Sequence, residues 1–190
     1  MERHQKLRRM KRPIDIRVQE FAIKQHDQVV NQKYGNRPYS YHLTKVAEVL
    51  DRFKRLFPED VFPLIKAGAW GHDLIEDARL TYNDVKERFG EEVAELIYAC
   101  TEDKGRTRAE RHSPRYFQGI VAVKWATAIK LADTIANIEA SIVDESRMLN
   151  RYTSEYEFFK EHIYAGVLRD GLQPMFQHYE SLVVPQMDMA

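Results

Sequence analysis

The chain has 190 residues, of which 44% are apolar and 31% are charged, so it is long enough to form one globular domain with its own core. Its 29 Lys and Arg residues balance 29 Asp and Glu residues, which gives no general electrostatic attraction to nucleic acid or to an anionic membrane. The single cysteine, Cys100, excludes an internal disulfide and a cysteine-rich zinc site, and it favours a reducing, cytoplasmic compartment and a place in the core.

The N-terminal segment is strongly basic. Six Lys and Arg residues lie within the first twelve positions, ahead of Pro13, and no apolar run follows them. We expect residues 1–13 to form a flexible basic arm, either a solvated terminus or a contact for an acidic partner. No stretch approaches the about 20 apolar residues of a bilayer span, and the start lacks the apolar segment of a signal peptide. Residues 14–190 are expected to form a single domain.

Apolar residues recur at helical spacing through most of this domain. The pattern predicts a first helix over residues 18–30, a second over 43–53, and a third after Pro58 that tolerates Pro63 in its first turn. Thr81 and Asp84 have the spacing of a capping box for a short helix that Gly90 ends, and another helix covers residues 93–97.

The second half of the chain contains one long polar segment. Residues 102–115 have no large apolar side chain and predict a loop. Helical spacing returns over residues 116–144, 154–165 and 172–182, with Gly166 and Gly171 between the last two. No alternating strand pattern is present. The sequence therefore predicts one all-α helical bundle of about seven or eight helices.

Four polar residues follow the apolar part of the third helix, in the segment GAWGHDLIEDA at residues 68–78. If the helix continues, Glu76 lies one turn beyond His72, and Asp77 one turn beyond Asp73. Charge there is costly unless a partner such as a metal compensates it. The alternative is a His72–Asp73 pair at a solvent-exposed helix end, and this segment alone favours neither interpretation.

Two further segments place single polar groups on apolar helical faces. Asp133 interrupts the apolar run of residues 126–140, and Asn137 lies one turn further on the same face. His42 lies near the start of the helix predicted after Pro38. Taken alone, Asp133 is typical of a hydrogen-bonded structural acceptor, and His42 of a core or capping histidine.

Together, the three segments supply two imidazoles and two carboxylates. These are His42, His72, Asp73 and Asp133. Such a mixed nitrogen and oxygen set suits a divalent transition metal, and we expect Mn²⁺, with Fe²⁺, Zn²⁺ or Co²⁺ as alternatives. The set would leave coordination positions open for water and substrate.

In their order along the chain, these residues resemble the HD-domain metal-dependent phosphohydrolases, whose pattern is a histidine, a His-Asp pair and a later aspartate on separate helices. Within that superfamily the chain is similar to the hydrolase domain of the Rel-type alarmone enzymes and to stand-alone small alarmone hydrolases. The matching segments are PYSYHL, HDLIED, KERFGEEVAELI, TEDK and IKLADTIANI, and the resemblance covers residues 14–183. It implies an all-helical HD-domain fold.

The resemblance also implies a role for each matching residue. Metal binding is implied for His42, His72, Asp73 and Asp133. Glu76 and Asp77 would orient or deprotonate the attacking water, and Asn137 would contact the nucleoside. Lys104 matches a basic residue near a substrate phosphate. Arg151 and Tyr156 lie where the family has further nucleotide contacts.

Two positions depart from the family pattern. Family members usually have a loop rich in Arg and Lys before the first ligand and a proline just after it. This chain has Lys33 and Tyr34 in the basic positions and Leu43 in place of the proline. Tyr34 cannot supply a phosphate-binding charge. Lys33 or Arg37 would therefore compensate, or the pocket would accept a different nucleotide.

The resemblance predicts a metal-dependent phosphohydrolase, foremost a (p)ppGpp 3′-pyrophosphohydrolase that releases pyrophosphate. The altered loop around Tyr34 keeps an HD-domain 5′-nucleotidase or deoxynucleoside-triphosphate hydrolase as an alternative. The alternative of another class is a non-catalytic nucleotide or metal sensor, which would not need the water-orienting acids Glu76 and Asp77. We expect a small-molecule nucleotide as partner and neither a membrane nor nucleic acid, while a homo-oligomer stays open.

Overall fold

Helices make up most of residues 12–187, the part of the chain that the computed structural model describes. In chain order they are α2 (Ile14–Ile23), the π-helix η1 (Lys24–Val30), α3 (Ser40–Arg52), the 3-10 helix η2 (Lys54–Leu56), α4 (Phe62–Gly71), α5 (Tyr82–Phe89), α6 (Glu91–Cys100), α7 (Arg108–Arg111), α8 (Pro114–Ala122), α9 (Ala126–Val143), α10 (Met148–Ser154), α11 (Tyr156–Arg169) and α12 (Gln173–Met187). Two short strands, β1 (Lys33–Tyr34) and β2 (Arg37–Pro38), pair antiparallel ahead of α3. The all-α class is confirmed, while most of the predicted basic arm, residues 1–11, lies outside the described residues.

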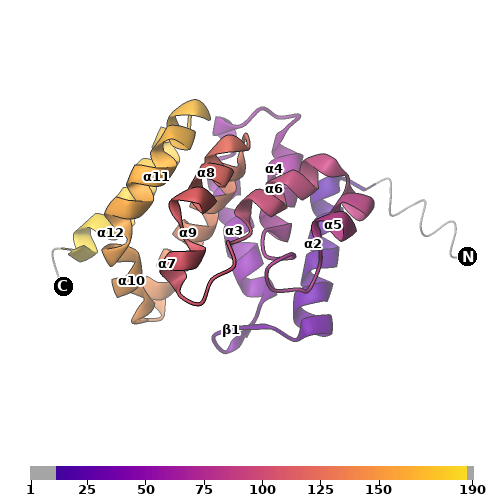
Figure 1. Cartoon of the computed structure of the whole chain (residues 1–190), viewed down its shortest axis with the longest axis horizontal. Coiled ribbons are helices and arrows are strands. Elements are labelled where there is room, and N and C mark those ends of the chain that lie inside the picture. The colour runs from indigo at the N-terminus through magenta and orange to yellow at the C-terminus, as the bar shows by residue number, and fades with distance from the viewer. Residues whose placement is uncertain (1–11, 188–190) are drawn as a thin grey trace, which may run out of the picture.

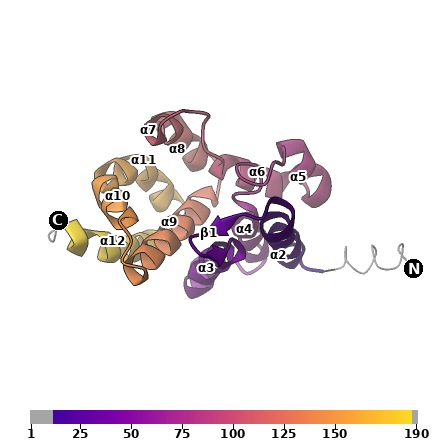
Figure 2. The same ribbon diagram turned by 90° about the horizontal axis from the view of Figure 1, so that it is seen from below.

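Two apolar clusters determine how the helices pack. The larger one joins α8, α9, α11 and α12 to α3, α4 and α6, and it includes the buried Cys100. The smaller one packs α2 and α5 against α3, α4 and α6. In Figures 1 and 2, α11 and α12 lie at one end of the molecule and α2 and α5 at the other, with α9 between them. Helices α3, α4 and α9 therefore contact one another in the middle. None of the helices in residues 12–187 is long and apolar enough to cross a bilayer.

Local signals explain where several helices begin and end. The Thr81 hydroxyl accepts a hydrogen bond from the backbone N–H of Asp84, and the Asp84 carboxylate accepts one from the backbone N–H of Thr81, which confirms the predicted capping box. Gly90 ends α5 with a φ of 99°, and Pro63 lies in the first turn of α4 as expected.

The structure has more helices than the seven or eight predicted, because short helices lack a long apolar pattern. The segment 102–115 is not a continuous loop: it contains α7, which begins with a capping box of Thr107 and Glu110. The predicted helix over residues 116–144 is interrupted before α9, where Trp125 has a φ of 71°. Gly166 lies inside α11, where an added Cβ would come within 2.1 Å of the Thr127 hydroxyl oxygen on α9, so close helix packing requires glycine there.

The predicted helix over residues 18–30 is divided into α2 and the π-helix η1. Val18 and Ala22 are buried as expected, but Val29 is 60% exposed. The wider turn of a π-helix changes the spacing at which residues share a face, which explains this difference. η1 ends at Asn31 with a φ of 55°, and the β1–β2 hairpin then leads the chain into α3.

Candidate metal and substrate site

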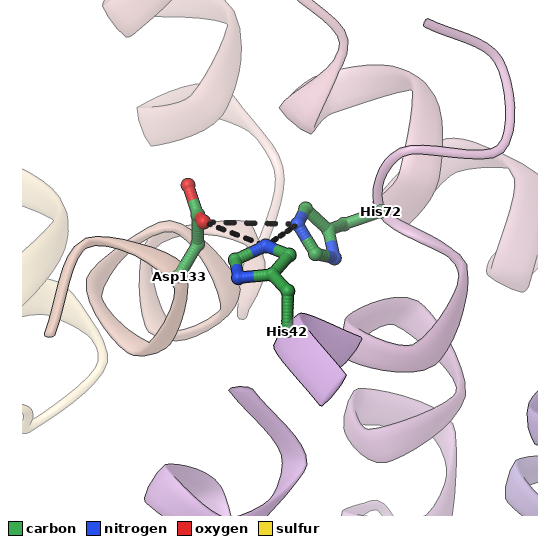
Figure 3. Close-up of side chains that lie close together, drawn as sticks. All are labelled: His42, His72 and Asp133. Atoms are coloured by element: carbon green, nitrogen blue, oxygen red, sulfur yellow. Dashed lines mark hydrogen bonds and ion pairs between the residues drawn. The ribbon is translucent and has the colours of Figure 1, made fainter. Parts of the chain in front are cut away.

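Three helices bring two histidines and an aspartate together in the middle of the molecule (Figure 3). His42 lies on α3, His72 directly follows α4, and Asp133 lies in the middle of α9. The Nε2 atoms of the two histidines are 3.2 Å apart, and Asp133 Oδ1 lies 3.3 Å from His42 Nε2 and 3.7 Å from His72 Nε2. All three residues are at most 9% exposed. Imidazole and carboxylate donors that converge in this way form a set that could hold a metal ion.

Asp73 places a second carboxylate beside this cluster. Its Oδ2 lies 2.9 Å from His72 Nε2 and 3.6 Å from His42 Nε2, and it accepts a hydrogen bond of 2.5 Å from the Tyr39 hydroxyl. Burial would raise the pKa of Asp73, but the charge of His72 and its hydrogen bond hold this pKa below the usual range. Asp73 is therefore an ionised carboxylate beside the three residues of the cluster.

The hydrogen bonds behind the cluster fit a bound cation. His72 Nδ1 donates to the backbone carbonyl of Ala69 at 2.8 Å, which turns Nε2 towards the cluster. Asp133 accepts from Lys130 Nζ at 2.9 Å and from Asn137 Nδ2 at 2.7 Å. Burial would lower the pKa of His72, but Asp73 and Asp133 raise it to about 9. The two carboxylates thus favour a positive charge in the cluster, which a divalent metal would supply.

Glu76 and Asp77 lie next to the cluster but not on a continuing helix. The helix α4 ends at Gly71, and residues 72–77 form turns, so the predicted shared helical face is wrong. Glu76 Oε2 accepts a hydrogen bond from the backbone N–H of Glu102 at 3.1 Å. Burial and the neighbouring carboxylates of Glu102 and Asp73 raise the pKa of Glu76 to about 7. Burial and Asp73 also raise the pKa of Asp77, which accepts a hydrogen bond from Gln32 at 2.8 Å.

The residues of the cluster line a cavity of about 460 Å³ together with Asp73, Glu76 and Asp77. Its walls add three basic groups and six aromatic rings. The basic groups are Arg108, His112 and Lys130, and the rings are Tyr34, Phe117, Tyr152, Phe158, Phe159 and Tyr179. Aromatic planes offer contacts for a nucleobase, and cations offer contacts for phosphates. The cavity is also of the size usual for small-molecule sites, about 300–1,000 Å³.

The structure brings together only part of the predicted site. The predicted residues that line the cavity are His42, His72, Asp73, Glu76, Asp77, Asp133 and Asn137. The predicted residues that do not line it are Lys33, Arg37, Lys104, Arg151 and Tyr156. Arg37 is bound instead to Asp144 by hydrogen bonds of 2.7 and 2.8 Å, and Tyr156 donates to Glu180 at 2.7 Å. Lys33, Lys104 and Arg151 have exposed side chains.

The sequence did not indicate several of the residues that line the cavity. Arg108 of α7 lines the cavity, although it lies in the polar segment interpreted as a loop. Its guanidinium is bound to Glu155 at 2.8 and 3.1 Å. Tyr152 of α10 lines the cavity, whereas its neighbour Arg151 does not. Five Lys and Arg residues lie within residues 102–115, and composition alone cannot distinguish the one that faces inward.

Comparisons with known proteins find relatives that are named as hydrolases. No model of a known protein family matches the chain. The chain is 28% identical over 169 residues to the guanosine-3′,5′-bis(diphosphate) 3′-pyrophosphohydrolase MESH1 of Mus musculus. The matched region covers 87% of this chain and 88% of the relative. It is 29% identical over 140 residues to MESH1 of Homo sapiens, covering 74% of this chain and 72% of the relative.

The fold is also similar to a solved structure. That structure is of a metazoan ortholog of SpoT described as hydrolysing ppGpp and playing a role in starvation responses. It matches with a TM-score of 0.56 and 25% identity, over 70% of this chain and 72% of the other. In sequence and in fold, the chain is therefore similar over most of its length to the alarmone pyrophosphohydrolases.

Proposed function

We propose that this protein removes the 3′-diphosphate of guanosine 3′,5′-bis(diphosphate), ppGpp, or of the corresponding pentaphosphate. The observation that supports this most is that the cluster of His42, His72 and Asp133 and the acids Glu76 and Asp77 line one nucleotide-sized cavity. The relatives named MESH1 carry this activity in their name, and their similarity extends over most of the chain.

The proposed metal ligands are His42, His72, Asp73 and Asp133. Mn²⁺ suits a set of two nitrogen and two oxygen donors, and Fe²⁺, Zn²⁺ and Co²⁺ are the alternatives. A divalent cation in this position would lower the pKa of water and neutralise charge on a phosphoryl group. Lys130 and Asn137 would keep Asp133 oriented, because both donate to its carboxylate.

Glu76 and Asp77 would act on the attacking water in different ways. Glu76 lines the cavity and has a pKa of about 7, so near neutral pH it would accept a proton from water and exchange it with solvent. Asp77 is held by Gln32 and would orient the water. The water oxygen would form a bond to phosphorus while the bond from phosphorus to the 3′ oxygen breaks. The products would be pyrophosphate and a nucleotide whose 3′ oxygen has gained a proton.

The remaining walls of the cavity would bind the nucleotide. Arg108 and Lys130 line the cavity and would supply cations to the phosphates. Asn137 would contact the nucleoside, although its side-chain oxygen accepts a hydrogen bond of 2.8 Å from the Tyr34 hydroxyl in this structure. Tyr34 would therefore have to release Asn137 to the substrate. Tyr34 stands where a basic residue for phosphate was expected. This replacement favours the second candidate function, a nucleotidase acting on another nucleotide.

A hydrolysis screen would test the proposal. The Mn²⁺-loaded protein would be incubated with ppGpp, pppGpp, deoxynucleoside triphosphates and 5′-mononucleotides, and the products separated by anion exchange and identified by ³¹P NMR. We expect pyrophosphate together with GDP or GTP. Release of phosphate or triphosphate from the other nucleotides, without turnover of ppGpp, would support the nucleotidase. Tight nucleotide binding without any turnover would support the sensor.

A further inference from the structure

His26 is a fully buried residue close to the candidate acids, and the chemistry proposed above gives it no role. It belongs to the π-helix η1, whose backbone closes with a hydrogen bond of 2.8 Å from the Gln32 N–H to the His26 carbonyl. This closure brings the side chains of residues 26 and 32 together. π-helical turns are frequent at functional sites, so the surroundings of His26 are of interest.

Gln32 connects His26 to Asp77. Gln32 Nε2 donates to Asp77 Oδ2 at 2.8 Å, and Gln32 Oε1 lies 2.6 Å from His26 Nδ1. An ionised carboxylate can only accept hydrogen bonds, so the Gln32 amide must turn its nitrogen to Asp77 and its oxygen to His26. His26 Nδ1 must then carry the hydrogen. The contacts thus determine both the amide orientation and the tautomer.

The other nitrogen of His26 agrees with this tautomer. Nε2 is buried and has no hydrogen-bond partner among the described residues. Burial lowers the pKa of His26, so the ring is neutral near pH 7 and Nε2 holds a lone pair instead of a hydrogen. An N–H at Nε2 would be a buried donor without an acceptor, which costs free energy. The neutral Nδ1–H form is therefore the one that the site stabilises.

His26 also supports Tyr39, which donates a hydrogen bond to the carboxylate of Asp73. Its ring stacks on the ring of Tyr39, with centroids 4.7 Å apart and an angle of 24° between the planes. The Tyr39 hydroxyl donates to Asp73 Oδ2 at 2.5 Å and lies 3.4 Å from Asp77 Oδ2. One buried imidazole thus contacts both side chains that hold Asp73 and Asp77 in place.

We propose that His26 is a positioning residue of the active site, acting on Asp77 through a hydrogen bond to Gln32 and on Asp73 through its stacking on Tyr39. The inference rests on the proposed function, because it assigns Asp77 to the attacking water. The two connections have different consequences. Loss of the hydrogen bond misplaces Asp77 and lowers kcat, whereas loss of the stacking loosens Tyr39 and with it the candidate ligand Asp73.

Two substitutions of His26 separate the two connections. His26→Phe keeps a ring for Tyr39 but removes the donor to Gln32, while His26→Asn keeps an N–H near the Nδ1 position but removes the ring. We expect His26→Phe and Gln32→Leu to lower kcat by about 10–100-fold with nearly unchanged KM and metal content. His26→Asn should retain more of kcat and bind metal more weakly. Gln28→Ala, on the exposed side of η1, is the matched control and should resemble the wild type.

Wild-type kcat in both His26→Phe and Gln32→Leu would overturn the inference. Equal losses of kcat in His26→Phe and His26→Asn, in proportion to equal losses in Tm, would also overturn it, since they would indicate a purely structural role. Gln32 is only half-buried, so its substitution tests the inference even if the His26 variants fold poorly.

An NMR measurement makes the test independent of activity. In the diamagnetic Zn²⁺-loaded protein, ¹⁵N spectra of the histidine rings should show His26 as the neutral Nδ1–H tautomer, and the Gln32→Leu substitution should shift its signals. An Nε2–H tautomer would contradict the network. If the tautomer is as expected but the wild type does not hydrolyse ppGpp, the positioning network is supported and the proposed function fails.

Discussion

The two parts of the cavity are held in place in different ways. The metal part is formed by His42, His72 and Asp133, which are buried and converge from three helices in mutual contact. The substrate part is formed by α7, α8, α10 and α11, and its walls are aromatic rings and the cation Arg108. The candidate metal ligands are held by hydrogen bonds to buried neighbours, such as Lys130 on Asp133 at 2.9 Å. Arg108, in contrast, forms an ion pair with Glu155 in which both side chains are partly exposed.

The metal part is thus preorganised, whereas the substrate part must adapt to its ligand. A cation site gains from donors that are fixed before binding, because little reorganisation then opposes the bound charge. A phosphate that enters the substrate part must share Arg108 with Glu155 or replace it. We therefore expect substitutions in the metal part to abolish the chemistry, and substitutions in the substrate part to change KM.

The largest effect is expected for Asp133→Ala. Asp133 is a candidate ligand and also the carboxylate partner of Lys130, whose side chain is only 12% exposed. The variant should lose bound Mn²⁺ and activity, and its free energy of unfolding should fall by about 3–5 kcal/mol because a buried charge is left without its partner. Metal analysis after dialysis against Mn²⁺ and denaturant unfolding would measure both effects. Asp144→Ala, which removes an exposed carboxylate, is the control; full metal occupancy in Asp133→Ala would refute the ligand assignment.

The next largest effect is expected for Glu76→Gln. The amide keeps the size of the side chain but cannot accept a proton from water, so kcat should fall by about 10²–10⁴-fold. Bound metal should remain, since Glu76 does not belong to the cluster of His42, His72 and Asp133. Single-turnover rates and metal analysis on the same preparation would check this. A fully active variant would transfer the role of the base to Asp77.

A smaller effect is expected for Arg108→Ala, in the substrate part. Loss of a cation that can bind phosphate should raise KM for ppGpp by about tenfold and leave kcat nearly unchanged. Lys104→Ala is the matched control from the same polar segment, because Lys104 is exposed and does not line the cavity. Steady-state kinetics of both variants would compare them. An equal rise of KM in both would mean that Lys104 reaches the substrate after all.

The convergence of His42, His72 and Asp133 could be predicted from the sequence, whereas the positions of Arg108 and Tyr152 could not. His42, His72 and Asp133 interrupt apolar helical patterns, and a polar residue on a buried face is a local signal that can be recognised in one sequence. The positions of Arg108 and Tyr152 depend on α7 and α10, which have four and seven residues and too few apolar positions to show a period.

Backbone geometry explains other differences. The side chains of His72, Asp73, Glu76 and Asp77 reach the cavity although α4 ends at Gly71, because the turns that follow keep the chain against the same wall. His26 was not recognised in the sequence, since its role depends on a π-helix, which no helical period predicts. Its fixed contact with Gln32, six residues later, could not be inferred from a spacing of three or four residues.

The smallest effect concerns the pH dependence of stability and returns to Glu76. Its pKa in the folded protein is about 7, raised from an ordinary value of 4.5 by burial and by Glu102 and Asp73. A raised pKa means that the folded state binds this proton more tightly than the unfolded state, so the stabilisation is complete below pH 4.5 and is lost as the pH rises through 7. Glu76→Gln resembles the protonated form at every pH. The Tm of the variant should therefore equal that of the wild type near pH 4.5 and exceed it by a few degrees near pH 8, in thermal unfolding of chelator-treated protein. Chelation is needed because a bound cation would itself favour the charged carboxylate. A Tm difference that stays constant between these pH values would show that the neighbouring carboxylates do not act on Glu76.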